Sequence, residues 1–129
     1  MEILEITENK EQYMDLLLLG DLQEGMIENY LQKGSLFALY DDYDLKTAAV
    51  VTKEDAETCE IKNLSTFKLY QGKGYENSMI KHLIQCYEKK CKRLIVVTGD
   101  NEVKLLFYEK LGFIYSHTAG EIVYYKYNY

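Results

Sequence analysis

The chain has 129 residues, of which 47% are hydrophobic and 28% are charged, a balance typical of one soluble globular domain with a buried core. Its net charge of −6 argues against a general nucleic-acid-binding protein, which needs a basic surface, and suits a cationic substrate. Three cysteines without scaffold spacing indicate reduced thiols. With no signal peptide and no apolar stretch of membrane-spanning length, we expect a cytoplasmic protein without a membrane partner.

The first half of the chain predicts a strand, two helices and a hairpin. Residues 2–6 alternate like a short strand, and two helical patterns follow, the second of which ends at Gly34. Segments 35–40 and 45–53 predict a β-hairpin around a polar turn at 41–44. The apolar stripe of the second helix is expected to comprise Leu22, Met26, Ile27, Tyr30 and Leu31.

The second half alternates strands with helices. We expect strands at 58–67, 93–98, 113–116 and 122–127 and helices at 74–89 and 101–111. The resulting order, β-α-α-β-β-β-α-β-α-β-β, predicts a mixed sheet with helices on its faces. Such an arrangement is an α/β or α+β layered domain, and it spans residues 1–129.

A glycine-rich turn, Tyr-Gln-Gly-Lys-Gly-Tyr at residues 70–75, connects the strand at 58–67 with the helix that follows. The first N–H groups of a helix have no intrahelical partner and carry partial positive charge, and glycine lets a phosphate approach the backbone closely. The turn therefore indicates a phosphate-bearing ligand. Taken alone, it also fits an ordinary connection between a strand and a helix.

Three segments together resemble the GNAT superfamily of acyl-CoA-dependent N-acetyltransferases. Residues 60–66 and 70–74 are similar to its motif A, and residues 101–113, with their Tyr-Glu-Lys-Leu-Gly-Phe ending, are similar to its motif B. The predicted order of elements matches that fold over nearly the whole chain. The resemblance implies a single-domain, mostly antiparallel sheet with a splay between two central parallel strands and helices on both faces.

The resemblance also implies a site for acetyl-CoA. Backbone groups at the end of the motif A strand would bind the pantetheine arm, and the N–H of Leu64 would polarise the thioester carbonyl. Asn101 would cap its helix or contact the pantetheine. The remaining residues expected to contact the donor are Ser65, Thr66, Gln71, Gly72, Lys73, Gly74, Tyr75 and Glu76.

Catalysis in this family needs a neutral amine and a protonated leaving thiolate. Tyr108 matches the family's general acid, and Glu60 on the motif A strand is the first candidate for the base. A second base position of the family falls near Val96, which cannot act as one. No cysteine or serine matches a nucleophile, so we expect direct attack of a primary amine on the thioester. Whether that amine belongs to a small molecule or to a peptide stays open.

Several alternatives remain beside this interpretation. Glu76 replaces a small residue of the turn motif, and its carboxylate would weaken binding of a pyrophosphate unless it points to solvent or caps the helix. A non-catalytic CoA-binding module is therefore the second hypothesis, and an interaction domain is the third. His82 and Cys86 lack the further ligands of a metal site, so no metal is expected. The tyrosine-rich segment 124–129 fits either a homodimer face or a closing strand.

Overall fold

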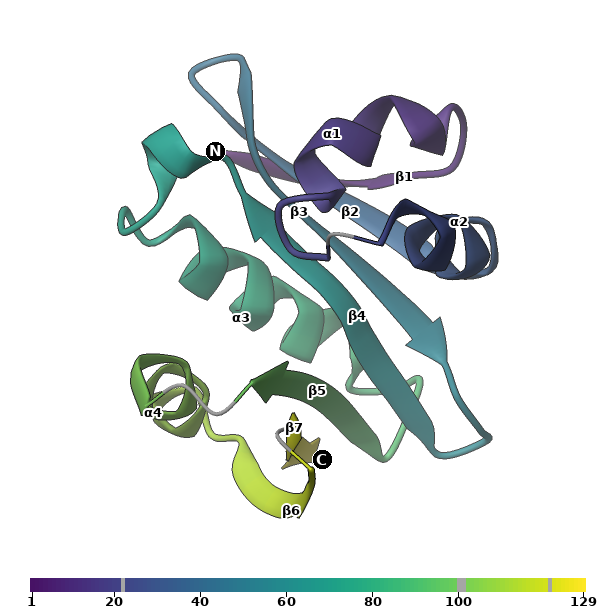
Figure 1. The fold of residues 1–129 in the computed structure, drawn as a ribbon, viewed down its shortest axis with the longest axis vertical. Helices are drawn as coiled ribbons and strands as arrows, with labels where there is room; N and C mark the ends of the chain where they lie inside the picture. The colour runs from purple at the N-terminus through teal and green to yellow at the C-terminus, as the bar shows by residue number, and fades with distance from the viewer. Residues whose placement is uncertain (22, 100–101, 121) are drawn as a thin grey trace.

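The computed structural model describes residues 1–21, 23–99, 102–120 and 122–129, and within them one sheet of seven strands organises the fold (Figure 1). The strand order is β1-β2-β3-β4-β5-β7-β6, in which β4 and β5 are parallel and every other neighbouring pair is antiparallel. The strands are β1 (Glu2–Ile6), β2 (Ser35–Asp41), β3 (Asp44–Lys53), β4 (Thr58–Thr66), β5 (Arg93–Gly99), β6 (Ile114–Ala119) and β7 (Ile122–Asn128).

Helices cover both faces of this sheet. A 3₁₀ turn, η1 (Lys10–Tyr13), leads into α1 (Met14–Leu17), and α1 shares one hydrophobic cluster with α2 (Glu24–Lys33). On the other face, α3 (Tyr75–Tyr87) and α4 (Glu102–Lys110) pack into a second cluster. None of the helices in the described part of the chain is long and apolar enough to cross a membrane.

Strand β3 shows why the central strands are apolar throughout. Ala48 and Val50 belong to the cluster under α1 and α2, whereas Ala49 and Val51 belong to the cluster under α3. Because successive side chains of a strand point to opposite faces, a strand covered on both faces is apolar at every position. The expected mixed, mostly antiparallel α/β fold with helices on both faces is confirmed.

The two central parallel strands are paired at one end and splayed at the other. Their register runs from Thr58 opposite Arg93 to Ile61 opposite Val96 and ends there. A β-bulge follows at once, since Val51 faces Ile61 and Val50 faces Asn63, which leaves Lys62 as the extra residue of β4. The predicted splay is therefore present, and it opens toward the carboxyl end of β4.

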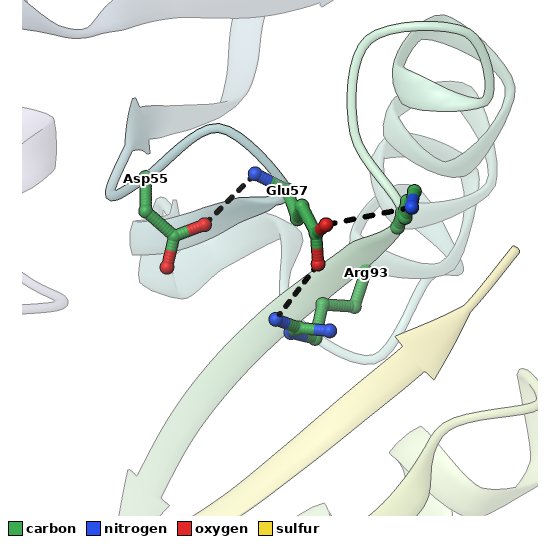
Figure 2. A network of polar contacts seen from close by, with 4 residues as sticks. Asp55, Glu57 and Arg93 are labelled. Atoms are coloured by element: carbon green, nitrogen blue, oxygen red, sulfur yellow. Dashed lines mark hydrogen bonds and ion pairs between the residues drawn. The ribbon is translucent and has the colours of Figure 1, made fainter.

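The paired end is fastened by Glu57, just before β4. The carbonyl of Glu57 accepts hydrogen bonds from the backbone N–H groups of Lys92 and Arg93, at 2.7 and 3.1 Å. Its carboxylate lies 3.4 Å from the Lys92 ammonium and 3.5 Å from the Arg93 guanidinium, and its own N–H donates to the Asp55 carboxylate at 2.8 Å (Figure 2). These contacts hold the amino ends of β4 and β5 side by side.

Element boundaries differ from the predicted ones at a few places. The hairpin turn is reduced to Asp42 and Tyr43, both at positive φ, because a two-residue turn of this kind matches the twist of the paired strands. In α2, Ile27 and Leu31 are buried, but Met26 is 51% exposed, so its assignment to the buried stripe was wrong. The neighbouring Leu22 lies outside the described residues.

The tyrosine-rich segment at the end of the chain is a closing strand. It forms most of β7, which lies between β5 and β6 in the sheet. Tyr125 is buried against Tyr108 and also meets Tyr115 on β6. The closing-strand interpretation is therefore confirmed, and the homodimer face stays a prediction.

Candidate active site

A cavity of about 610 Å³ lies at the splayed end of β4 and β5. Its walls come from the segment that follows α1, the end of β4, the glycine-rich turn with the first residues of α3, and one side of α4. Most of the residues predicted from the sequence meet here. They are Leu64, Ser65, Thr66, Gln71, Gly72, Gly74, Tyr75, Glu76 and Tyr108.

Two predicted residues are not part of this lining. Lys73 is exposed on the turn between Gly72 and Gly74 and does not face the cavity. Glu60 lies nearer the paired end of β4, opposite Ile95. Asn101 lies outside the described residues, so its predicted role is not tested by the structure.

The backbone of the turn has the conformation that the sequence indicated. Gly72 and Gly74 have φ of +75° and +89°, a region that side-chain-bearing residues rarely adopt. Gly74 is the N-cap of α3, and no side chain caps this helix end. The first N–H groups of α3 therefore remain available to an anion, on a turn that lines the cavity.

The side chain of Gln71 ties the turn to β4. Its Nε2 donates a hydrogen bond to the Thr66 carbonyl at 3.1 Å. The amide thus holds the turn against the end of the strand, across the short 3₁₀ turn η2 (Lys68–Tyr70) that lies between them. Gln71 therefore positions the turn and also lines the cavity, and its predicted contact with the donor stays a prediction.

Glu76 occupies an unexpected position. Its carboxylate accepts a hydrogen bond from the Thr66 hydroxyl at 3.2 Å, and that hydroxyl also meets the Thr47 hydroxyl at 2.8 Å. The side chain therefore neither points into solvent nor caps α3, the two arrangements considered from the sequence. It lies along the cavity wall toward the end of β4, where the first turn of the helix stabilises its negative charge.

Tyr108 is both a core residue and a cavity residue. Only 6% of it is exposed, and its ring packs on Phe107 and Phe113 with centroids 5.1 and 5.6 Å apart. Burial, and then the nearby charge of Glu76, raise the pKa of the phenol well above its usual value. The hydroxyl is therefore protonated at neutral pH, as a proton donor in the cavity must be.

Glu60 takes part in an ion-pair network on β4 and its neighbour. The Lys62 ammonium lies 3.0 Å from the Glu60 carboxylate and 2.8 Å from that of Glu54. Burial raises the pKa of Glu60, while the hydrogen bond and charge of Lys62 oppose the rise. A raised carboxylate pKa suits a general base, but this base lies outside the cavity and is engaged by a lysine.

The opposite wall of the cavity depends on Gly20, which sequence reasoning did not single out as a site residue. A Cβ at this position would collide with the Ser65 hydroxyl and come within 2.8 Å of the Asn63 side-chain oxygen. Asn63 and Ser65 in turn donate to the Leu17 carbonyl at 2.9 and 3.4 Å. In the sequence, a glycine at the end of a helix indicates only a C-cap. The close approach of Gly20 to β4 could therefore not be predicted from the sequence.

The cysteines and His82 lie apart from this cavity. Cys59 and Cys91 are buried in the cluster under α3, and the Cys86 sulfur lies 3.3 Å from the His82 ring nitrogen. Within the described residues, no group of three or more His, Cys, Asp and Glu side chains is arranged to hold a metal ion.

Comparisons with known proteins agree on one family. The model of the acetyltransferase (GNAT) family matches residues 6–113. The chain is 28% identical over 108 residues to an uncharacterized N-acetyltransferase, YvbK, of Bacillus subtilis (strain 168), an alignment that covers 82% of this chain and 70% of that protein.

Solved structures share the fold. One is a GNAT family acetyltransferase from Elizabethkingia anophelis with acetyl-CoA bound, 23% identical, with a TM-score of 0.92 over 99% of this chain and 97% of that chain. Another is a Bacillus subtilis acetyltransferase in complex with CoA, 21% identical, with a TM-score of 0.90 over 99% of this chain and 98% of that chain.

Proposed function

The chain belongs to the acetyltransferase (GNAT) family and is an acyltransferase, and from this premise we propose that its domain, residues 1–129, transfers an acetyl group from acetyl-CoA to a primary amine by direct attack. One observation carries the proposal. A single cavity joins a glycine turn at a helix start, the unpaired end of a parallel strand and the buried phenol of Tyr108. These features supply a phosphate seat, a backbone edge and a proton donor.

Donor binding follows from the two ends of the cavity. The pyrophosphate would accept hydrogen bonds from the N–H groups of residues 72–76, where the helix dipole favours negative charge. The pantetheine arm would lie along the end of β4 like an added strand, since the register with β5 stops at Ile61. Structural neighbours of this chain were solved with acetyl-CoA and with CoA bound, which supports this ligand.

The chemical step is acyl transfer to nitrogen. A neutral amine attacks the thioester carbonyl carbon, a C–N bond forms, and the carbonyl oxygen becomes an oxyanion that the N–H of Leu64 would stabilise. The C–S bond then breaks, and the Tyr108 hydroxyl gives its proton to the departing thiolate. Transfer of one proton from the amine nitrogen to a base completes the balance, and Glu60, acting through water, is the proposed base.

The surroundings of the hydroxyl and thiol groups support direct attack. Ser65 lines the cavity, but its hydroxyl hydrogen-bonds with the Asn63 side-chain oxygen and lies within 3.4 Å of the Leu17 carbonyl. Burial raises the pKa of the Cys59 thiol to about 11, and Cys59 does not line the cavity. Neither residue has the activating base that a covalent acyl-enzyme mechanism needs.

A second candidate function is a CoA-binding module that does not turn over its ligand. The position of Glu76 favours it, because a carboxylate on the cavity wall opposes binding of a pyrophosphate nearby. Thr66 holds that carboxylate toward β4, so its negative charge is partly offset by a hydrogen bond. The two functions differ in turnover and not in binding.

The test separates binding from turnover. Thermal shift of the purified protein with acetyl-CoA and with CoA measures binding, and we expect both ligands to raise Tm. Release of free thiol with a panel of polyamines, aminoglycosides and peptide N-termini then measures transfer and identifies the acceptor class. Binding without thiol release for any amine would support the second candidate, and the absence of binding would refute both.

A further inference from the structure

The glycine-rich turn is anchored to the β2–β3 hairpin, which no sequence motif connects with donor binding. The Tyr75 hydroxyl donates a hydrogen bond of 2.8 Å to the carboxylate of Asp41, the last residue of β2. Tyr75 is the first residue of α3 and lines the cavity. The hydrogen bond lowers the pKa of Asp41, so the acceptor stays a carboxylate at neutral pH.

A second contact reaches the other flank of the turn. Lys46 on β3 is only 5% exposed, and its ammonium lies 3.5 Å from the centroid of the Tyr70 ring and 3.9 Å from the Asp44 carboxylate. Lysine is rarely buried so deeply without a partner, and an aromatic face is a partner for a cation. Tyr70 also packs edge-on against Tyr75, with ring centroids 6.4 Å apart.

A third contact lies beneath the turn. The Thr47 hydroxyl on β3 hydrogen-bonds with the Thr66 hydroxyl at 2.8 Å, and Thr66 donates to Glu76 in the first turn of α3. The hairpin therefore contacts the segment before the glycines, the segment after them and the end of β4.

We propose that Asp41 and Lys46 are positioning residues that hold the glycine-rich turn in its donor-binding geometry. The inference rests on the proposed function, since it assigns these contacts to the pyrophosphate seat. Gly72 and Gly74 have nothing within 4 Å of where a Cβ would be, so the space on that side of both glycines is open. Glycine backbone is costly to order, and anchors on both flanks fix the turn before the donor arrives.

The decisive experiment compares two donors in the same variants. Acetyl-CoA contacts the seat, whereas S-acetylpantetheine has the same thioester and arm but lacks the diphosphate. We expect Asp41→Asn and Tyr75→Phe each to weaken acetyl-CoA binding by about threefold to tenfold, measured by calorimetry. Binding of S-acetylpantetheine, measured by ligand-observed NMR at millimolar concentration, is expected to stay unchanged.

Matched controls isolate the contact. Asp42→Asn removes the same charge one residue along, at a position of positive φ that asparagine tolerates, and is expected to bind both donors like the parent protein. Asp41→Asn weakens this charge-assisted hydrogen bond and also removes the ion pair with the N-terminal ammonium, 3.4 Å away, whereas Tyr75→Phe removes the hydrogen bond alone. In the double variant of Asp41 and Tyr75, the loss should therefore be smaller than the sum of the two single losses. Lys46→Met keeps most of the unbranched side chain but removes its charge, and it should reproduce the selective loss.

The outcomes distinguish failure of the positioning role from failure of the proposed function. If the parent protein binds acetyl-CoA and the variants bind it equally well, the positioning role is overturned. Equal weakening for both donors would show a general structural role and would overturn it too. If the parent protein itself binds no acetyl-CoA, the proposed function fails, and the positioning role that rests on it fails with it.

Discussion

The two ends of the β4–β5 pair differ in what lies beside the backbone of β4. At the paired end, β4 contacts β5 directly. The two strands pair from Thr58 to Ile61, and Glu57 binds Lys92 and Arg93 (Figure 2). At the splayed end, the register stops, a bulge at Lys62 turns β4, and a cavity takes the place of the next strand.

The difference shows how the backbone of a sheet can contribute to a binding site. Backbone N–H and C=O groups need partners, and a strand that lacks a neighbour offers its groups to a ligand. The contacts at the paired end hold β4 and β5 together beside the open end. Changes at the open end should therefore affect binding and catalysis, and changes around Glu57, at the amino end of the pair, should affect stability alone.

Gly74→Asp should have the largest effect at the open end. A side chain at φ of +89° strains the backbone, and a carboxylate beside the helix start repels a diphosphate. We expect CoA affinity to fall by at least about 100-fold in calorimetric titration. Gly25→Asp adds the same charge at an exposed position near the start of α2 and should bind CoA normally. Normal affinity of the Gly74 variant would refute the phosphate seat.

Tyr108→Phe should separate chemistry from binding at the same end. The ring keeps its packing on Phe107 and Phe113, but the proton donor is lost, so we expect kcat to fall by about 10²-fold with CoA affinity nearly unchanged. Steady-state thiol release and equilibrium binding provide the two measurements. Tyr115→Phe, which removes an exposed hydroxyl, is the control. An unchanged kcat would remove Tyr108 from the mechanism.

Lys62→Met tests whether the bulge residue tunes Glu60. Lys62 lowers the Glu60 pKa against the larger effect of burial, so its removal should raise that pKa further. A base acts in its deprotonated form, hence the acidic limb of the kcat/KM profile should move to higher pH, with activity lost first at low pH. The profile is measured by thiol release across pH, with Lys81→Met as the control. An unmoved limb would exclude Glu60 as the base.

Glu57→Gln tests the paired end and should have the smallest effect. Its ion pairs with Lys92 and Arg93 are partly exposed, and such pairs contribute at most about 1 kcal/mol. The backbone hydrogen bonds remain in the variant. We expect a small fall in the free energy of unfolding in urea and an unchanged affinity for CoA. Weakened CoA binding would mean that the two ends are coupled.

The fold was predictable from the sequence because its signals are local. Apolar periodicity located α3, a continuous apolar run located β5, and the glycines located the turn, since glycine tolerates positive φ. Tyr108 was found only through the order of the motifs. With 13 tyrosines in the chain, the residue type alone carries little information.

The rest depends on contacts between distant segments. The direction of the Glu76 side chain is set by Thr66 and Thr47, and the engagement of Glu60 is set by a lysine beyond it on the strand. The Glu76 contacts do not follow from spacing along the chain, whereas Lys62 and Glu60 are two residues apart on one strand, a spacing that favours a shared face. Met26 was misassigned because helical periodicity predicts which face of a helix is buried but not how wide the buried strip is.

The place of β7 in the sheet has a consequence for how the protein comes to fold. β7 follows β6 in the chain, yet in the sheet it lies between β6 and β5. The β5–β7 and β6–β7 pairs can therefore form only once residues 122–128 have been synthesised. Tyr125 on β7 packs against Tyr108 and donates to the Glu109 carboxylate. Tyr108, the proposed proton donor, therefore reaches its final packing only after β7 has joined the sheet.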